Sequence, residues 1–435
     1  GSTAFGNTAG PDGAAGAAAI TATGLTGFAA TFAVGAFQVI GAMIINKVLG
    51  PKPPSAQSID RDNVYSLGAI RNQARQYEPP GLLFGEFRVT PDVISMPYSV
   101  YKGNDQYQSF VLSPGINVAR YDNFMIGDTP VTDFEEIKFW QSGFSDMPDQ
   151  EIPVATNADT ITGPVLDPHV VNTRTGSVNT VRFQVDISYL LFDLTSKGGK
   201  KDNQEQIVIS YRKVGDPSFT AAGSFYIVSR EQTQQRRSYA FDVPLGQYEV
   251  SVMRSGLDTR TRLGEEDSKG ATCEFTWTTL VSYQKDNSNY RGIARIGMEW
   301  RATGQFSGTP DQVRALMIAN PIPVWNGSAW VTATRRANGL SNVAANCLKY
   351  LRGYYDPDGK LIAGLGWPDA MIDVESFKAW MLDCTEYEWN YDNWVTNDRN
   401  HDEMLQALAL AGMGIGNVVA PPLVKKYFPR HVATV

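Results

Sequence analysis

The chain has few histidines that could take part in catalysis. The three histidines, His169, His401 and His431, are scattered through 435 residues. Ser-His-Asp and Cys-His catalysis each need a histidine held beside the nucleophile. The sequence contains no Gly-x-Ser-x-Gly and no His-Glu-x-x-His motif. Asp402 and Glu403, which follow His401, fit the first turn of a helix, where acidic side chains complement the helix dipole. We therefore expect no hydrolase of these types.

Two acidic pairs, Glu135-Glu136 and Glu265-Glu266, raise the question of glycoside hydrolysis. That reaction needs two carboxyl groups that flank one glycosidic bond. Neighbouring residues on a strand point to opposite faces, so these pairs are better interpreted as solvated surface.

Aromatic and basic clusters suggest binding chemistry. Trp380, Trp389 and Trp394 could stack on sugar rings, but a packed core or a subunit interface explains them better. The lysine-rich run 197–201 lacks the Gly-x-x-x-x-Gly-Lys-Ser/Thr spacing of a phosphate-binding loop. We interpret this run as a solvated hairpin loop.

The cysteine pattern indicates neither a metal site nor a disulfide framework. Cys273, Cys347 and Cys384 are widely spaced, and no Cys-x-x-Cys or Cys/His cluster occurs. We predict three buried free thiols. Together these patterns predict a protein that is not an enzyme and that needs no metal or cofactor.

The composition is that of a globular protein of about three domains. Hydrophobic residues make up 43% and charged residues 19% of the chain, and the net charge is −7. Because no basic patch is present, we expect no specific nucleic-acid binding. An acidic wall would suit a channel through which DNA passes without sticking. Ordinary mild acidity explains the same charge.

The N-terminal 54 residues form a Gly/Ala-rich apolar segment that ends in a proline linker. No charged residue lies between Asp12 and Lys47, and the stretch 20–45 is long enough to span a membrane as a helix. Three interpretations stay open: a membrane anchor, a helix packed inside an assembly, or a segment stored in a particle and inserted into a host membrane later. The large apolar side chains of this possible membrane or bundle segment are Phe28, Phe32, Phe37, Ile40, Ile44 and Ile45.

The remainder is predicted to be mainly β, with a C-terminal α+β part. Short strands separated by turns indicate a β-rich domain of meander or barrel type over 55–165, with one strand at 82–89. Residues 146–180 have turn signals and little periodicity. Over 181–187 apolar and polar residues alternate, so we expect one buried face. Six or seven such strands over 166–290 predict an inserted β-sandwich of the fibronectin or immunoglobulin type.

The region 291–435 begins with strands and continues with helices. An Asn-Gly hairpin is expected at 323–330. Apolar residues at helical spacing predict helices over 342–351, 373–389 and 400–413, the second of them capped by Asp373.

Several stretches of this chain resemble the host-specificity, or tail tip attachment, protein J family of lambda-type long-tailed phages. The resemblance runs from Ser55 to the end of the sequence. It is carried by RGIARIGMEWRATGQFSGTP, PVWNGSAW, NVAANCLKYL and IDVESFKAWMLDCTEYEWN. VRFQVDI, TSKGG, QYEVSVMR and NVYSLGAIRNQARQYEPPGLLFGEFRV resemble the family as well.

The resemblance implies a structural role at the tail tip of a virion. Members of the family form a homotrimer, the central tail hub, which closes the tail tube and opens for DNA ejection. The implied partners are other tail tip proteins, distal tail and tube proteins and the tape measure protein. Contact with a host receptor or outer membrane is implied through other parts, because this chain ends at Val435 without the usual later modules. The rival functions are a module that binds a surface receptor or glycan and a membrane-anchored enzyme active on cell walls.

Overall fold

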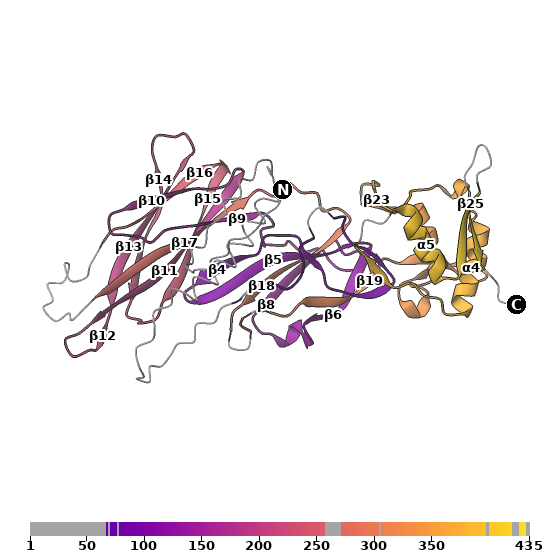
Figure 1. Cartoon of the computed structure of the whole chain (residues 1–435), viewed down its shortest axis with the longest axis horizontal. Coiled ribbons are helices and arrows are strands. Elements are labelled where there is room, and N and C mark those ends of the chain that lie inside the picture. The colour runs from indigo at the N-terminus through magenta and orange to yellow at the C-terminus, as the bar shows by residue number, and fades with distance from the viewer. Residues whose placement is uncertain are drawn as a thin grey trace, which may run out of the picture.

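The chain forms an elongated molecule in which β-sheets predominate. The computed structural model describes residues 67, 70–75, 78–256, 271–303, 306–308, 310–396, 400–419 and 426–431. A β-sandwich occupies one end, three helices occupy the other, and further sheets lie between them (Figure 1). The prediction of a mainly β chain with C-terminal helices is confirmed. The N-terminal apolar segment, with Phe28, Phe32, Phe37, Ile40, Ile44 and Ile45, lies outside the described residues.

Two sheets build the central region. The larger sheet has the order β24-β1-β5-β18-β8, and β3 and β4 also pair with β5. Its strands are β1 (Leu82–Phe84), β3 (Asp92–Val93), β4 (Tyr98–Lys102), β5 (Asp105–Ile116), β8 (Ile137–Ser142), β18 (Ile293–Arg301) and β24 (Asn393–Val395). The smaller sheet has the order β2-β19-β6-β7. Its strands are β2 (Glu86–Val89), β6 (Val118–Ile126), β7 (Thr129–Pro130) and β19 (Val313–Ala319).

Gly85 divides what the sequence predicts as one strand. β1 and β2 flank this glycine and belong to different sheets. Gly85 has φ +64°, a value that side chains with a Cβ rarely adopt. A Cβ here would also collide with the carboxylate of Asp392. The prediction of one continuous strand over 82–89 is therefore wrong, because the chain turns from one sheet into the other at this point.

The sandwich comprises two sheets around a core of its own. One sheet has the order β10-β16-β13-β14, and the other has the order β9-β17-β11-β15, with β12 also paired to β11. The strands are β9 (Ala158–Thr162), β10 (Val171–Thr175), β11 (Thr180–Leu194), β12 (Lys200–Lys201), β13 (Asn203–Lys213), β14 (Thr220–Ser229), β15 (Gln235–Gly246), β16 (Tyr248–Arg254) and β17 (Thr272–Gln284). The core between the sheets includes Phe183, Ile207, Val252 and Trp277. The hairpin with the lysine run, β11–β12, is confirmed.

The strand order of this sandwich is that of a jelly roll. With the short β12 set aside and the other strands numbered along the chain, the sheets run 2-7-4-5 and 1-8-3-6. This order is produced by two Greek keys, whereas immunoglobulin-type sandwiches follow another order. The expected sandwich is present, but the fibronectin type is wrong. The alternation of apolar and polar residues along a strand indicates which face of that strand is buried. It does not indicate which other strands pair with it, and the type of sandwich depends on that pairing. The strands β9 and β10 within 146–180 were missed.

Strand β11 is buried on both faces, although its alternation predicts only one buried face. Phe183, Val185 and Ile187 point into the core of the jelly roll. Gln184 and Asp186, which alternate with them, are only 1% and 3% exposed. The reason is that another part of the chain covers the outer face, as described below.

Three helices and several short elements form the helical end. The helices are α3 (Val343–Arg352), α4 (Val374–Glu386) and α5 (His401–Ala411). Asn342, Asp373 and Asn400 cap them, each accepting a hydrogen bond from a backbone N–H in the first turn. Helix α4 ends before the predicted 389, because Glu388 adopts φ +55°. The strands here are β20 (Ile322–Trp325), β21 (Trp330–Ala333), β22 (Tyr354–Tyr355), β23 (Leu361–Ala363), β25 (Gly414–Val419) and β26 (Lys426–His431). Single 3₁₀ turns are η1 (Val131–Asp133), η2 (Arg336–Asn338) and η3 (Asp369–Met371).

One apolar core joins the helical end to the central sheets. It contains Phe84 and Trp300 from the larger sheet, Met317 from the smaller sheet, and Leu348 and Trp380 from the helices. The jelly roll has a separate core. Movement of the helical end against the sheets would therefore disrupt an apolar core, whereas the jelly roll needs other contacts to hold it in place.

Candidate joints and assembly surfaces

The residues with catalytic potential are dispersed. His169 is exposed in the jelly roll, whereas His401 lies at the start of α5, at the other end of the molecule (Figure 1). His401 Nδ1 lies 2.8 Å from the hydroxyl of Tyr350. Asp402 and Glu403 stand in the first turn of α5, as predicted. His431 lies in β26.

The acidic pairs do not form a facing pair of carboxylates. Glu136 is held in an ion pair with Arg301, whereas Glu135 is exposed. Both border a shallow hollow that is also lined by Phe134, Ile137, Thr303 and Phe306. Glu265 and Glu266 lie outside the described residues.

The three tryptophans with possible sugar-stacking roles are mostly engaged in packing. Trp380 is fully buried, and its indole N–H donates to the Gly412 carbonyl at 2.9 Å. The indole N–H of Trp394 donates to the Pro114 carbonyl at 2.7 Å. Trp389 is half-buried and stacks on Tyr387 at 5.1 Å between ring centroids. The interpretation as a packed core fits Trp380 best.

The cysteines only partly match the prediction. Cys273, Cys347 and Cys384 are not in disulfide bonds, but only the last two are buried, and Cys273 is half-buried. The prediction of burial is therefore wrong for Cys273. Within the described ranges, no group of three or more His, Cys, Asp or Glu residues could hold a metal ion. None of the helices described here is both long and apolar enough to cross a membrane.

A polar joint attaches the jelly roll to the central region. The β4–β5 hairpin lies against the outer face of β11 and β15. The backbone N–H of Tyr101 donates to Ser238 Oγ at 2.8 Å. The side-chain amide of Gln184 donates to the Ser99 carbonyl at 2.8 Å. The ring of Tyr98 packs edge-on against Tyr283, with 5.1 Å between the centroids. These contacts cover the second face of β11.

Asp186 lies at the centre of this joint. Its Oδ1 accepts hydrogen bonds from Ser238 Oγ at 2.5 Å and from Gln184 Nε2 at 2.7 Å. Among the described residues no cation pairs with it. Burial raises the pKa of Asp186 from 3.8 to about 7, although the two hydrogen bonds act in the opposite direction. Asp186 therefore changes charge close to neutral pH, at a contact between two parts of the molecule.

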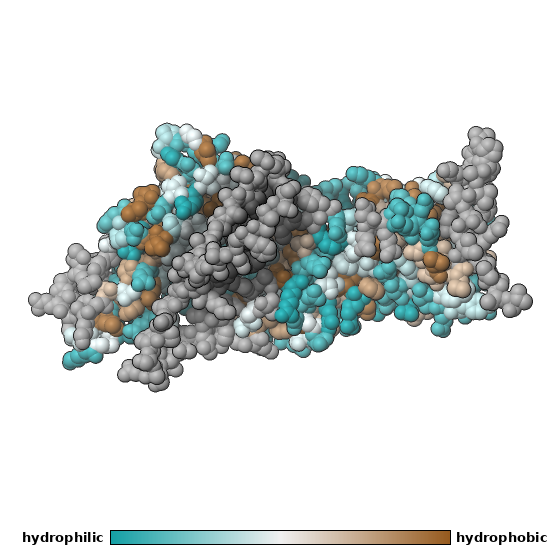
Figure 2. Space-filling view, in the orientation of Figure 1, coloured by the Kyte–Doolittle hydropathy of each residue, from teal (hydrophilic) through white to brown (hydrophobic). Residues whose placement is uncertain are grey.

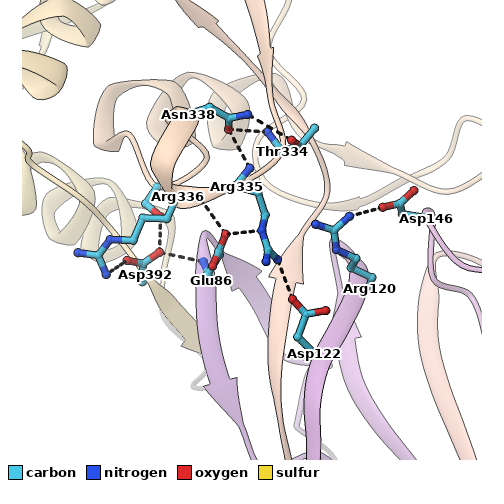
Figure 3. Close-up of polar contacts among 10 residues, drawn as sticks. Glu86, Arg120, Asp122, Asp146, Thr334, Arg335, Arg336, Asn338 and Asp392 are labelled. Carbon is cyan, nitrogen blue, oxygen red and sulfur yellow. Dashed lines mark hydrogen bonds and ion pairs between the residues drawn. The ribbon is translucent and has the colours of Figure 1, made fainter.

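A second joint ties the helical end to the central sheets (Figure 3). Arg335 lies 2.8 Å from Asp122 of β6 through Nη1 and 3.6 Å from Glu86 of β2 through Nε. The backbone N–H of Arg336 donates to Glu86 Oε1 at 2.8 Å. Asn338 holds this loop, because its side-chain oxygen accepts from the Arg335 N–H at 2.8 Å.

Asp392 extends this second joint to the strand β24. Its Oδ2 lies 3.0 Å from Nη1 of Arg336. Its Oδ1 accepts from the Glu86 N–H at 2.8 Å and from the hydroxyl of Ser341. The side chains of Asp392 and Glu86 are only 13% and 16% exposed. Ion pairs at such partly buried sites are stronger than exposed ones, because water screens them less.

An exposed aromatic patch lies where the β20–β21 hairpin meets α4. We call Trp325, Trp330, Lys378 and Leu382 the hairpin–helix patch. The Lys378 ammonium lies 4.4 Å from the ring centroid of Trp325 and 5.9 Å from that of Trp330. Trp330 is 38% and Leu382 39% exposed. The ammonium therefore attaches the hairpin to the helix by cation–π contacts and leaves apolar surface open to solvent.

The charge of the chain is not concentrated at either end of the molecule. Residues 320–435, which include the helical end, have twelve acidic and ten basic residues. Between 166 and 290, which includes most of the jelly roll, fifteen acidic residues balance fifteen basic ones. Most of the net charge of −7 therefore comes from the rest of the sequence.

Sequence reasoning missed both joints. Gln184 and Asp186 occupy the polar positions of an alternating strand, which are normally solvent-facing. Glu86 and Arg335 are separated by about 250 positions in the sequence. The one local signal is the glycine at 85, which marks a change of direction.

The comparisons with known proteins identify no family. No protein-family model matches the chain, and no curated protein matches it. Among solved structures, a family 16 carbohydrate-binding module is 10% identical, with a TM-score of 0.14 over 29% of this chain and 78% of that one. The stem and receptor-binding domain of spike protein P1 from bacteriophage PM2 is 10% identical, with a TM-score of 0.19 over 52% and 99% of the two chains.

A third similar structure is that of infectious bursal disease virus, Gx strain. It is 9% identical, with a TM-score of 0.17, and the match covers 58% of this chain and 84% of that one. Two of these three structures come from viral particles or spikes. At such low scores the likenesses carry no argument about fold or function.

Proposed function

We propose that this chain is a structural subunit of a viral tail tip, of the central tail hub type. The proposal rests on the sequence resemblance that runs from Ser55 to the C-terminus and on the architecture of the molecule. In this role three copies close the end of the tail tube. They link the tube to receptor-binding parts and open when DNA is ejected. The chain carries no catalytic role in this proposal.

The observation that carries the proposal is the way in which the parts of the molecule are joined. The Asp186 joint holds the jelly roll on the β4–β5 hairpin, and the Arg335 joint holds the helical end on the central sheets. Both joints use buried or partly buried polar groups, which hold a defined geometry because each partner is costly to leave unpaired. A subunit that transmits force in a particle needs such fixed joints.

Two features of the molecule suit a position in a tail tip. The net charge of −7 would repel DNA, so the chain can lie near a channel without binding the nucleic acid. The hairpin–helix patch offers an aromatic contact surface for other tail tip, distal tail, tube or tape measure proteins. The apolar N-terminal segment would pack against copies of itself or against other tail proteins, or would be released toward a host membrane.

Immunoelectron microscopy of intact particles tests the proposal. An antibody against an exposed surface of the helical end, around Leu410, should decorate the tail tip and no other part of the virion. Two results would overturn the proposal. One is decoration of the capsid, and the other is no decoration of particles in which mass spectrometry after unfolding detects the chain. Receptor or glycan binding by the chain away from any particle would favour the rival binding module instead.

A further inference from the structure

The contact between the jelly roll and the β4–β5 hairpin lies outside both large apolar cores. One core belongs to the jelly roll, and the other joins the central sheets to the helical end. The contact has a small apolar cluster of its own, in which Tyr98 packs on Ala158, Val281 and Tyr283. Figure 2 shows hydrophilic and hydrophobic residues mixed over the surface of the jelly roll, as expected of a unit with its own core. The contact can therefore open without disrupting either large core.

Two side chains connect Asp186 to the backbone of the hairpin. Ser238 Oγ donates to Asp186 Oδ1 and accepts from the backbone N–H of Tyr101. Gln184 Nε2 donates to Asp186 Oδ1 and also to the Ser99 carbonyl. The groups that hold the carboxyl group of Asp186 are therefore the same groups that bind the hairpin. Any change in the charge of Asp186 acts directly on these hydrogen bonds.

Asp186 is the group in this contact that titrates near neutral pH. The other ionisable side chains that face the contact are Arg182 on β11, Arg236 and Asp242 on β15, Tyr283 on β17, and Tyr98 and Tyr101 on β4. Burial raises the pKa of each of these tyrosines, so they stay uncharged. Arg182 pairs with Asp242, and Arg236 lies over the ring of Tyr101, 5.4 Å from its centroid. Arginine side chains keep their charge at every pH used here.

Loss of the proton from Asp186 places an uncompensated charge in this contact. The residue is only 3% exposed, and a buried charge without a cation is costly. Water reaches the carboxylate when the hairpin moves away, because the hairpin covers this face. Opening breaks the two hairpin hydrogen bonds and the edge-on contact between Tyr98 and Tyr283. These contacts keep the joint closed while Asp186 is protonated.

We propose that Asp186 makes this joint a pH-sensitive switch, in which loss of its proton releases the β4–β5 hairpin from β11 and β15. The jelly roll can then move against the central region while each keeps its own core. The joint is fixed in acid and loosens as the pH rises through neutrality. The inference does not depend on the proposed function, because it uses only the contacts of this joint.

The size of the effect follows from the pKa of Asp186, which is about 7 in the closed joint against 3.8 for a free side chain. Between these two values the closed joint holds a proton that the open joint has lost. Within that range each pH unit changes the ratio of open to closed joints about tenfold. The open population should therefore rise roughly 100-fold between pH 5 and pH 8 and level off above it.

Hydrogen exchange of the full chain, resolved to single residues by mass spectrometry, measures this opening. The reporters are the backbone amides of Tyr101 and Arg236, because their acceptors, Ser238 Oγ and Asn104 Oδ1, lie across the joint. After correction for the intrinsic effect of pH on exchange, both amides should exchange roughly 100-fold faster at pH 8 than at pH 5 in wild type. In Asp186→Asn their corrected rates should stay nearly constant. Asp242→Asn, which removes an exposed carboxylate from the same sheet, is the matched control and should behave as wild type.

Backbone amides of β13 distinguish opening of the joint from unfolding of the jelly roll. Ile207 and Ile209 of this strand lie in the jelly-roll core, so their amides should exchange more slowly than the two reporters at every pH. Equal rates for reporters and β13 amides would overturn the inference, since the joint would then open only when the jelly roll unfolds. This comparison needs wild type alone. Equal pH dependence of the reporters in wild type and Asp186→Asn would also overturn it, since another group would then drive the opening.

Discussion

Replacement of Asp186 by asparagine should remove a defined pH dependence of stability. The asparagine side chain keeps an oxygen for the Ser238 and Gln184 donors, but it cannot become charged. In the folded protein the pKa of Asp186 is about 7, against 3.8 for a free side chain. The folded state therefore holds a proton in the range between these values that the unfolded state has lost.

The sign and size of this pH dependence follow from the difference in proton binding between the folded and the unfolded protein. The stability that this proton contributes is fully present below about pH 4 and is lost as pH rises through about 7. One pKa unit corresponds to ~1.4 kcal/mol, so the total is about 4 kcal/mol, and about 3 kcal/mol of it falls between pH 5 and pH 8. Relative to wild type, Asp186→Asn should therefore gain about 3 kcal/mol of unfolding free energy over that interval.

Differential scanning calorimetry of the full chain at several pH values measures this difference. Other titrating groups are common to both proteins, so their effects cancel when the variant is compared with wild type. Asp242→Asn is the matched control, because its carboxylate on the neighbouring β15 is 78% exposed. A difference between Asp186→Asn and wild type that stays constant from pH 5 to pH 8 would refute the reasoning about the joint.

Two further substitutions test the second joint and the turn that feeds it. Arg335→Met should destabilise the chain by about 2 kcal/mol, since Asp122 and Glu86 lose a charged partner. The control Arg71→Met breaks an exposed ion pair and should change stability by less than about 0.5 kcal/mol. Calorimetry measures both changes, and equal effects would contradict the assigned joint. Gly85→Ala should destabilise by about 2 kcal/mol or more, because it combines a left-handed backbone with a collision at Asp392. Gly103→Ala, at φ +63° with nothing within 4 Å, should cost about 1 kcal/mol, and a larger loss there than at position 85 would count against the argument.

Local patterns in the sequence predicted the elements well. The alternation around Phe183 correctly indicated a strand with a core-facing side, and Asp373 correctly marked the start of α4. Both features depend on residues within one element, since the spacing of buried side chains and the capping of a helix are local properties of the sequence.

The arrangement of the elements was beyond the reach of these patterns. The jelly-roll order depends on which strands pair across long stretches of chain, and no residue within β11 specifies that β17 and β15 are its neighbours. Gln184 and Asp186 look like solvent-facing residues until the β4–β5 hairpin is placed over them. The predicted domain boundaries at 54, 165 and 290, the trimer and the tail partners stay predictions.

A cryo-electron microscopy reconstruction of the tail tip, from particles that carry an affinity tag on this chain, tests the central claim most directly. The account predicts three copies arranged around the axis of the tail tube at its distal end, with the joints at Asp186 and Arg335 intact in each copy. A tag located elsewhere in the particle, or a distal end closed by other proteins alone, would contradict it.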